Sequence, residues 1–477
     1  KKNTLDDRTS NFNGIYNMDE GEKYPLSLKR DVSLKGASRD ATILDANDII
    51  YLMYGIASAN NYSVSNLTLR NGNGNTFSYA GRGAFTLENN YNAHYENLLI
   101  SNNIGSYVSG GHVLNGDNIL FRNIEFRHNI GGNPLRIINN KTGLLHDTVF
   151  IESCQFIGNL PDYSIPDEGL GGSVAVIGRM FADYPNKITC IFKNCLFAKN
   201  RARILESGGG AAAALHALYS SQVYLVNCTF SENIAEHPER ISIGVTNGSN
   251  MHIYNSLLYD NEPLEIGIAG SQDYPCSLNI YNSLVDGGED GIKYISDYNS
   301  VFYDTETNID EDPLFLGKWE HPYQIDNGSP CIDAGTLNLP DFIEIPMFDL
   351  AGNPRIVGDS IDIGAYEWNP TVGIDKYQYQ PIEHEKPKLL KAAPNPFSTQ
   401  TRISANWDFV GHVQIEIYNN SGLRVDILKS DQSYGIASLI TSWDGKDQYG
   451  NVLPAGIYHV VLLLDEKKVE SLKVVKP

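Results

Sequence analysis

The sequence has no run of about 20 apolar residues, the length that an α-helix needs to cross a bilayer, so no membrane-spanning helix is expected. A Lys/Arg cluster is also missing, and 57 Asp and Glu residues outnumber 36 Lys and Arg residues. The net charge of −21 makes nucleic acid and anionic lipid poor partners, whereas Ca²⁺, cationic groups and neutral glycans suit it. The chain opens with the polar residues Lys1, Lys2 and Asn3 and not with a signal peptide, so we expect a processed or partial product.

The six cysteines show no CxxC spacing and no neighbouring His pair, which argues against a zinc site. Cys154, Cys195 and Cys228 occupy equivalent places in consecutive repeats, directly after the repeated residue described below. We therefore expect a column of free, buried thiols that act as small hydrophobic residues, with disulfides as the alternative. The pairing of the remaining three stays open: Cys190, Cys276 and Cys331.

A short phrase recurs through the chain: an Asn, an apolar residue three positions later, and an Asn or Gly three positions after that. Asn227, Phe230 and Asn233 show the phrase in full, and Ser153 replaces the first Asn in one copy. Successive copies are mostly 26 to 33 residues apart, which is the length of one repeating structural unit. The first Asn of the phrase stands at Asn66, Asn97, Asn123, Asn194, Asn227, Asn255 and Asn282.

Each copy has the pattern of short strands around a turn. Residues 191–197 and 224–230 alternate between apolar and polar with the strand period of two, and glycine-rich openings such as 208–210 lead into a third apolar strand. Three strands and three bends per repeat predict a parallel β-helix of nine or more coils, roughly 45 to 55 Å long at a strand spacing of about 4.8 Å. The stacked Asn side chains would hydrogen-bond along the axis as an asparagine ladder.

The opening strands in residues 24–45 resemble the N-terminal coils of secreted right-handed β-helix proteins of the pectate-lyase-like superfamily. Residues 328–367 resemble the terminal module of many bacterial surface β-helix proteins. The resemblance implies a β-helix over residues 1–368 with a capping module at about 316–368. We expect Asp333 and Asp362, together with Asp349, to pair with Arg355 in this cap; Ca²⁺ binding by these carboxylates is the alternative.

A composition shift follows the β-helix. Residues 369–386, rich in Pro, Tyr and Glu, have no apolar periodicity and are expected to form a linker. In residues 387–477 the Asn phrase disappears, and about seven short strand patterns separated by turns predict a β-sandwich. The fold class expected is therefore all-β: a right-handed parallel β-helix followed by a small Ig-like β-sandwich.

The tail is similar to C-terminal sorting domains of the type IX secretion system and to the Ig-like module of flagellar hook-capping proteins. The motifs that carry this similarity include Ala393 to Phe397, Trp443 to Gly445 and Pro454 to Tyr458. The resemblance implies an extracellular or outer-membrane surface location in a Gram-negative bacterium, with the secretion machinery as a partner.

Two functional hypotheses are open for the β-helix, because this fold hosts both enzymes and non-enzymes. The first is an adhesin or structural rod that binds a polysaccharide or a cell-surface protein, with Tyr163, Arg201 and Arg203 on adjacent insertions as the expected contacts. The alternative is a polysaccharide lyase or glycoside hydrolase acting in the groove of the β-helix, with Arg203 and His216 as candidate catalytic residues. No cofactor is expected apart from Ca²⁺, and self-assembly is a further option without a specific signal.

Overall fold

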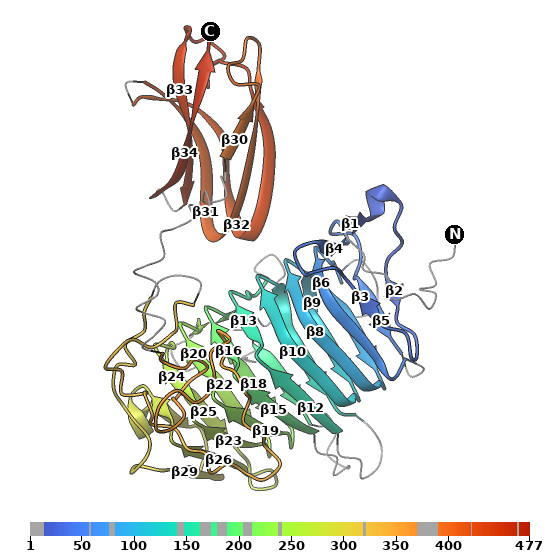
Figure 1. Cartoon of the computed structure of the whole chain (residues 1–477), viewed down its shortest axis with the longest axis vertical. Coiled ribbons are helices and arrows are strands. Elements are labelled where there is room, and N and C mark those ends of the chain that lie inside the picture. The colour runs from blue at the N-terminus through green and yellow to red at the C-terminus, as the bar shows by residue number, and fades with distance from the viewer. Residues whose placement is uncertain are drawn as a thin grey trace. The chain divides into compact units, whose positions relative to one another are not determined.

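The computed structural model consists of β-strands and two short 3-10 turns, η1 (Met18–Glu20) and η2 (Gly288–Gly291), with no α-helix among the described residues. The chain divides into two compact units, residues 1–373 and 374–477, which are described separately. The fold class expected from the sequence, a parallel β-helix followed by a small β-sandwich, is confirmed (Figure 1). The structure describes residues 14–56, 59–75, 82–140, 147–162, 173–178, 188–203, 212–236, 241–317, 321–369, 390–420, 422–464 and 467–477.

One side of the β-helix is a ten-stranded sheet in which every neighbouring pair is parallel. Ten strands at about 4.8 Å spacing extend over roughly 43 Å. The strands are β2 (Leu26–Ser27), β5 (Met53–Gly55), β7 (Phe85–Glu88), β9 (Ile104–Leu114), β11 (Ile130–Ile138), β14 (Val174–Ile177), β18 (Leu215–Leu218), β22 (Ile243–Thr246), β25 (Ile266–Ala269) and β28 (Ile292–Tyr294).

The other two sides belong to one bent, seventeen-stranded sheet. Its strands are β1 (Gly14–Asn17), β3 (Leu34–Lys35), β4 (Thr42–Asp45), β6 (Tyr62–Arg70), β8 (Tyr91–Ser101), β10 (Asp117–Arg127), β12 (Asp147–Glu152), β13 (Gln155–Ile157), β15 (Ile188–Lys193), β16 (Leu196–Ala198), β19 (Gln222–Val226), β20 (Thr229–Ser231), β23 (Asn250–Tyr254), β24 (Leu257–Tyr259), β26 (Cys276–Tyr281), β27 (Leu284–Val285) and β29 (Asn299–Tyr303). A two-stranded sheet, β17 (Arg201–Ala202) with β21 (Ile234–Ala235), completes the coils.

The repeated Asn marks the bend of this sheet. At all seven repeated Asn positions the backbone is left-handed, with φ between 46° and 58°. Asn tolerates this conformation better than other non-glycine residues, which explains why the phrase repeats it. This position therefore requires a residue that adopts the left-handed backbone of the bend, and its side-chain amide matters less.

The interior of the coil is filled by stacked side chains of like kind. Phe126, Phe156, Phe197 and Phe230 stack with centroid separations of 4.9, 4.8 and 4.4 Å. All six cysteines are free and buried, so the prediction of buried thiols in the Cys column is confirmed. Continuous stacking of this kind gives each coil a packed contact with its neighbours.

A continuous asparagine ladder exists, but it is formed by the last Asn of the phrase. In each successive pair the Nδ2 of one residue donates to the Oδ1 of the next, at 2.8 to 3.0 Å. The residues are buried inside the coil: Asn103, Asn129, Asn159, Asn200, Asn233 and Asn261. This ladder satisfies backbone groups at a second bend that apolar side chains could not satisfy.

The second unit is an antiparallel sheet of five strands, β30 (Leu390–Ala393), β31 (Thr401–Asn419), β32 (Arg424–Trp443), β33 (Gly456–Leu464) and β34 (Lys467–Lys476). The prediction of about seven short strands is therefore wrong in detail, because β31 and β32 are each continuous across segments that we expected to form separate strands. Residues 405–411 contain no proline that would interrupt β31. The core packs around Trp443, whose ring lies 5.0 Å from that of Tyr458.

Candidate functional site

The seven Asn residues at the first bend fall into two groups. Asn97 Nδ2 donates to Asn66 Oδ1 at 2.7 Å, and Asn123 Nδ2 donates to Asn97 Oδ1 at 3.3 Å, which is the expected ladder. The chain of amides stops at Ser153, because a serine cannot continue it. From Asn194 onward the amides bind another part of the chain.

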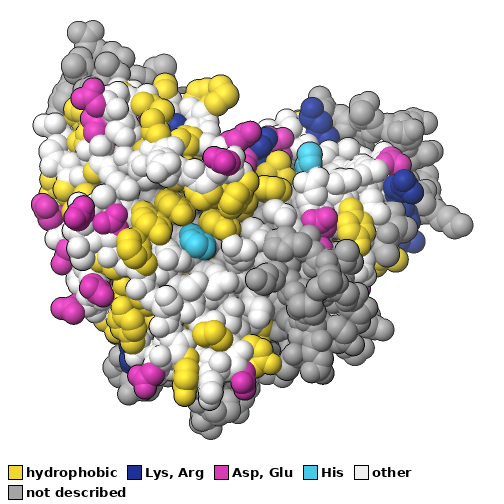
Figure 2. Space-filling view, turned by 90° about the horizontal axis from the view of Figure 1, so that it is seen from below, with side chains coloured by type: hydrophobic (Ala, Val, Ile, Leu, Met, Phe, Trp, Pro, Cys, Tyr) yellow, Lys and Arg dark blue, Asp and Glu magenta, His cyan; other side chains and the backbone are white. Residues whose placement is uncertain are grey.

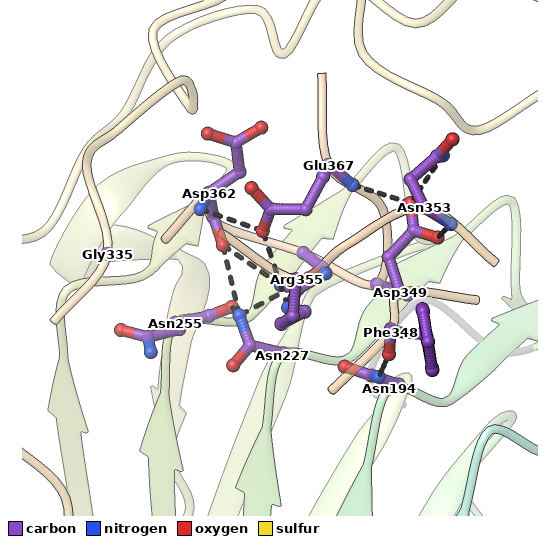
Figure 3. Close-up of polar contacts among 12 residues, drawn as sticks. Asn194, Asn227, Asn255, Gly335, Phe348, Asp349, Asn353, Arg355, Asp362 and Glu367 are labelled. Atoms are coloured by element: carbon purple, nitrogen blue, oxygen red, sulfur yellow. Dashed lines mark hydrogen bonds and ion pairs between the residues drawn. The ribbon is translucent and has the colours of Figure 1, made fainter. Parts of the chain in front are cut away.

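The described residues 316–317 and 321–368, called the flank module from here on, lie along the side of the β-helix over this bend (Figure 3). Asn194 Nδ2 donates to Phe348 O at 2.6 Å, and Asn227 Nδ2 donates to Asp362 O at 3.0 Å. Asn255 Nδ2 donates to Thr336 O at 2.9 Å and its Oδ1 accepts from Thr336 N at 2.7 Å. Asn282 Nδ2 donates to Ala334 O at 3.3 Å.

This arrangement corrects the expected cap. The module's apolar residues cover the outer faces of two columns of strands, for example Ile343 against Ile191 and Tyr224, and Ile363 against Leu257. Its hydrogen bonds and apolar contacts extend along the flank of the coils, from Asn194 to Leu284. Strand outer faces in this half are apolar and need cover, which the module provides.

The charges inside the module also pair differently from expectation. Arg355 is buried, and its Nε lies 3.3 Å from Glu367 Oε1, with both side chains 1% exposed. Its Nη2 donates to Asp362 O at 3.1 Å and to Gly364 O at 2.6 Å (Figure 3). The Asp333 and Asp362 carboxylates instead accept backbone N–H groups, from Ser360 and from Asp333 and Trp368. These contacts are structural, and burial raises the pKa of Glu367 to about 8 although Arg355 opposes the rise.

Among the described residues, the polar cluster with the most unused hydrogen-bonding capacity lies elsewhere, on the outer face of the ten-stranded sheet. Parallel register places Thr86 of β7 beside His112 of β9, and His112 beside Arg136 of β11. The residue before His112 is Gly111. A Cβ at this position would lie 2.2 Å from the Phe85 ring, so no larger residue fits there. Three consecutive coils thus present one row of polar side chains.

Arginines lie on both sides of His112. The Arg82 guanidinium pairs with the Glu88 carboxylate at 2.8 Å, and these side chains are 19% and 34% exposed. Arg136 donates through Nη1 to Asn133 Oδ1 at 3.0 Å, and its Cζ lies 4.1 Å from the centre of the Tyr107 ring. Among the described residues Arg136 has no carboxylate partner.

His112 is 2% exposed, and neither ring nitrogen makes a hydrogen bond within the described part of the chain. The buried Thr86 Oγ1 is likewise without a hydrogen-bond partner there. Burial, reinforced by Arg82 and Arg136, holds the pKa of His112 well below its ordinary value. The ring is therefore neutral at neutral pH and can accept a proton or a hydrogen bond.

Taken together, this Arg82–His112–Arg136 site offers two guanidinium groups, a neutral imidazole and nearby phenols. The Tyr51 ring lies 6.5 Å from that of Tyr54, and Tyr54 continues the row beside Thr86. Guanidinium groups bind carboxylates through paired N–H donors, and phenols contribute both ring area and hydroxyl groups. Such a set suits an anionic, hydroxyl-rich ligand.

The residues expected from the sequence to form the site are not all described. His216 lies on β18 in the same row as Arg136, separated from it by Ala175, and its Nε2 is 3.2 Å from Thr246 Oγ1. Arg201 is exposed on β17, and Arg203 follows that strand. Tyr163 lies outside the described residues.

His112 and Arg82 were missed by sequence reasoning, although a signal for His112 exists. His112 directly follows Gly110 and Gly111, and His216 follows a run of four alanines that ends at Ala214, two positions before it. Aligning these two small-residue openings in the sequence would have placed His112 in the same row as His216. Arg82 lies within its own opening, between Gly81 and Gly83, and its place near His112 comes from the parallel pairing of Arg82 with Val108 of β9.

No group of three or more His, Cys, Asp or Glu residues in the described ranges could hold a metal ion. Within the same residues, no helix has the length and apolar character required to span a bilayer.

Comparisons with known proteins give only distant likenesses. No protein-family model and no curated protein matches the sequence. The catalytic domain of a GH87 alpha-1,3-glucanase, solved in complex with tetrasaccharides, is 10% identical over 62% of this chain and 63% of its own, with a TM-score of 0.30. The enzymatically active domain of bacteriophage CBA120 tailspike protein 2 is 11% identical over 96% of this chain and 72% of its own, with a TM-score of 0.29. At these values neither likeness bears on the site or its chemistry.

Proposed function

We propose that this protein binds an acidic polysaccharide through the Arg82–His112–Arg136 site. The observation that carries the proposal is Arg136, a half-buried guanidinium with no carboxylate partner among the described residues. Burying a cation without a counter-charge is costly unless a ligand supplies one. A uronate carboxylate would supply it, while Tyr107 and Tyr54 would lie beside the sugar ring.

The direction of the row supports a linear ligand. Strands about 4.8 Å apart place His216 roughly 10 Å from Arg136 and Lys293 roughly 24 Å from it along the same outer row. A chain lying across the strands would meet further basic groups at these intervals. Side chains in a row on a rigid sheet are already ordered, so binding costs them little further conformational entropy.

Cleavage by β-elimination is the second candidate, and it is favoured by the neutral ring of His112, whose nitrogens make no hydrogen bond to any described residue. Elimination requires a base and a cation that stabilises the uronate, and His112 beside Arg136 supplies both. At 2% exposure His112 must become accessible before it can act, so binding ranks first. Hydrolysis is not proposed, since it requires two carboxylates and the described site has only Glu88, paired with Arg82.

The test is retention of the purified protein on immobilised alginate and polygalacturonate, with and without Ca²⁺, together with an assay for unsaturated chain ends. We expect retention that Arg136→Ala weakens at least tenfold. Arg30→Ala, which removes an arginine that is 68% exposed and follows β2, outside the row of polar side chains, serves as the matched control. New unsaturated ends would establish the lyase. Absence of retention, or equal retention of both variants, would refute the proposal.

We propose further that the protein acts at the cell surface after export, as an adhesive binding protein. The sequence similarity of residues 387–477 to type IX sorting domains supports this location. Expression of the full chain and of a chain ending at Asn369 in a host with type IX secretion tests it. Surface display of the full chain alone is the expected result, and equal display of both would contradict it.

A further inference from the structure

The outward side chains of the seventeen-stranded sheet change chemistry along the coil. In one row Arg122 pairs with Glu152 at 2.8 Å, and Glu152 pairs with Lys193 at 2.6 Å. Beyond Lys193 the same row continues through Val226 to Tyr254 and Tyr281. Strands β19, β23 and β26 contain no Asp, Glu, Lys or Arg.

Two ring stacks cover this uncharged region. Tyr254 and Tyr281 stack at 5.1 Å with 10° between their planes, and Phe302 follows Tyr281 at 5.2 Å. In the adjacent row Tyr224 and His252 stack at 4.8 Å and 10°. Phe342 of the flank module meets the Tyr224 ring edge-on at 5.2 Å. The six residues, called the aromatic face, are Tyr224, His252, Tyr254, Tyr281, Phe302 and Phe342.

The aromatic face is accessible to a ligand at Phe302 and Phe342 and, in part, at His252, Tyr254 and Tyr281, whereas Tyr224 is buried at 7% exposure beneath the flank module. The face also has polar groups among its rings. Phe302 is 49% exposed and Phe342 is 58% exposed. Asn279 Nδ2 lies 3.5 Å from His252 Nδ1, and burial lowers the pKa of His252, so this ring is neutral. Figure 2 shows hydrophobic side chains gathered on one face of the molecule, with a histidine among them. Exposed aromatic groups of this extent mark an interaction surface more often than chance.

We propose that the aromatic face binds a neutral polysaccharide, independently of the acidic-sugar site. A sugar ring has apolar C–H faces and hydroxyl edges, which match aromatic rings interleaved with amides and hydroxyl groups. Charge selects the class of ligand, because a charged sugar would be desolvated here without a counter-charge, whereas a neutral sugar has no charge to desolvate. The rod then holds two glycan surfaces of different chemistry on different sheets.

Affinity electrophoresis in gels containing laminarin, galactomannan, xyloglucan or dextran tests the proposal. We expect at least one of these to retard the full chain. Phe302→Ala and Phe342→Ala should each weaken the retardation several-fold, and the double variant about tenfold or more. Both side chains are half exposed, so the variants should fold, which the far-UV spectrum checks. Tyr449→Ala, an 81% exposed aromatic residue in the second unit, is the control.

Three results would overturn the proposal. One is that none of the neutral polysaccharides retards the protein, and another is that the double variant behaves as wild type. The third is a sedimentation shift from dimer to monomer in the double variant, which would assign the face to a second copy of this chain. Arg136→Ala should leave retardation by neutral polysaccharides unchanged, because it affects only the acidic-sugar site.

Discussion

Asn261 donates both its backbone N–H and its side-chain amide to the carboxylate of Glu265, at 3.1 and 2.7 Å. Glu265 thereby ends the interior asparagine ladder, in the place where another Asn would otherwise continue it. The carboxylate is buried, and burial raises its pKa to about 8 in spite of these two hydrogen bonds.

The Glu265 carboxyl should make stability depend on pH. In the unfolded chain it ionises near its ordinary pKa of about 4.3, whereas in the folded chain it stays protonated up to about 8. The contribution of Glu265 to the free energy of unfolding is therefore complete at low pH. It is lost as pH rises through this window, by roughly 3 to 5 kcal/mol. Glu265→Gln should remove this loss in chemical unfolding at pH 5 and pH 9. The exposed neighbour Glu262, changed to Gln, should leave it intact.

His112 should produce the opposite dependence. Its folded pKa is depressed, so the unfolded chain binds a proton below about pH 6.5 that the folded chain does not. Stability is complete above that pH and falls as pH decreases. We expect His112→Gln to flatten the fall in thermal midpoint between pH 8 and pH 5, while the exposed His94→Gln retains it. A fall that is the same in both variants would show that His112 titrates normally.

The interior ladder should matter more for stability than the outer one. Asn200 makes four hydrogen bonds through its buried amide, to Asn159 twice and to Phe156 and Asn233 once each. Asn200→Ala should cost about 3 to 5 kcal/mol of unfolding free energy. Asn123→Gly keeps the left-handed bend and removes one exposed hydrogen bond, so it should cost less than about 0.5 kcal/mol. Urea unfolding compares them, and similar costs would contradict this assignment.

The buried pair in the flank module should be costly to break and cheap to replace. At pH 9, where Glu367 is ionised, Arg355→Met leaves its carboxylate buried without a cation and should cost about 3 kcal/mol, whereas adding Glu367→Gln should recover at least half of that. Thermal unfolding of the two single variants and the double variant measures the coupling. The exposed pair of Lys446 and Asp444 is the reference, and Lys446→Met there should cost less than about 1 kcal/mol.

The buried thiols should be unreactive in the folded protein. Burial raises the pKa of Cys154 to about 12, which keeps it a thiol and not the nucleophilic thiolate. A disulfide-exchange reagent should modify none of the six cysteines before unfolding and all of them in denaturant. Rapid modification of the native protein would contradict their burial.

The sequence by itself determined the coil. The strand period of two, the left-handed preference of Asn and the recurrence of small residues after the repeated Asn are local properties, and each is carried by the residues of a single repeat. They sufficed to predict stacked parallel strands and buried cysteines. They did not separate the outward bend at Asn194 from the inward ladder at Asn200, because both positions carry the same residue.

Only the tertiary structure decided which functional side chains lie next to one another. The repeats differ in length, so the register that puts His112 beside Arg136 arises from strand pairing and not from a fixed spacing. The flank module reaches Asn227 from 135 residues away in the chain. Contacts over such separations form when the packed coil supplies the surface, and no local pattern encodes them.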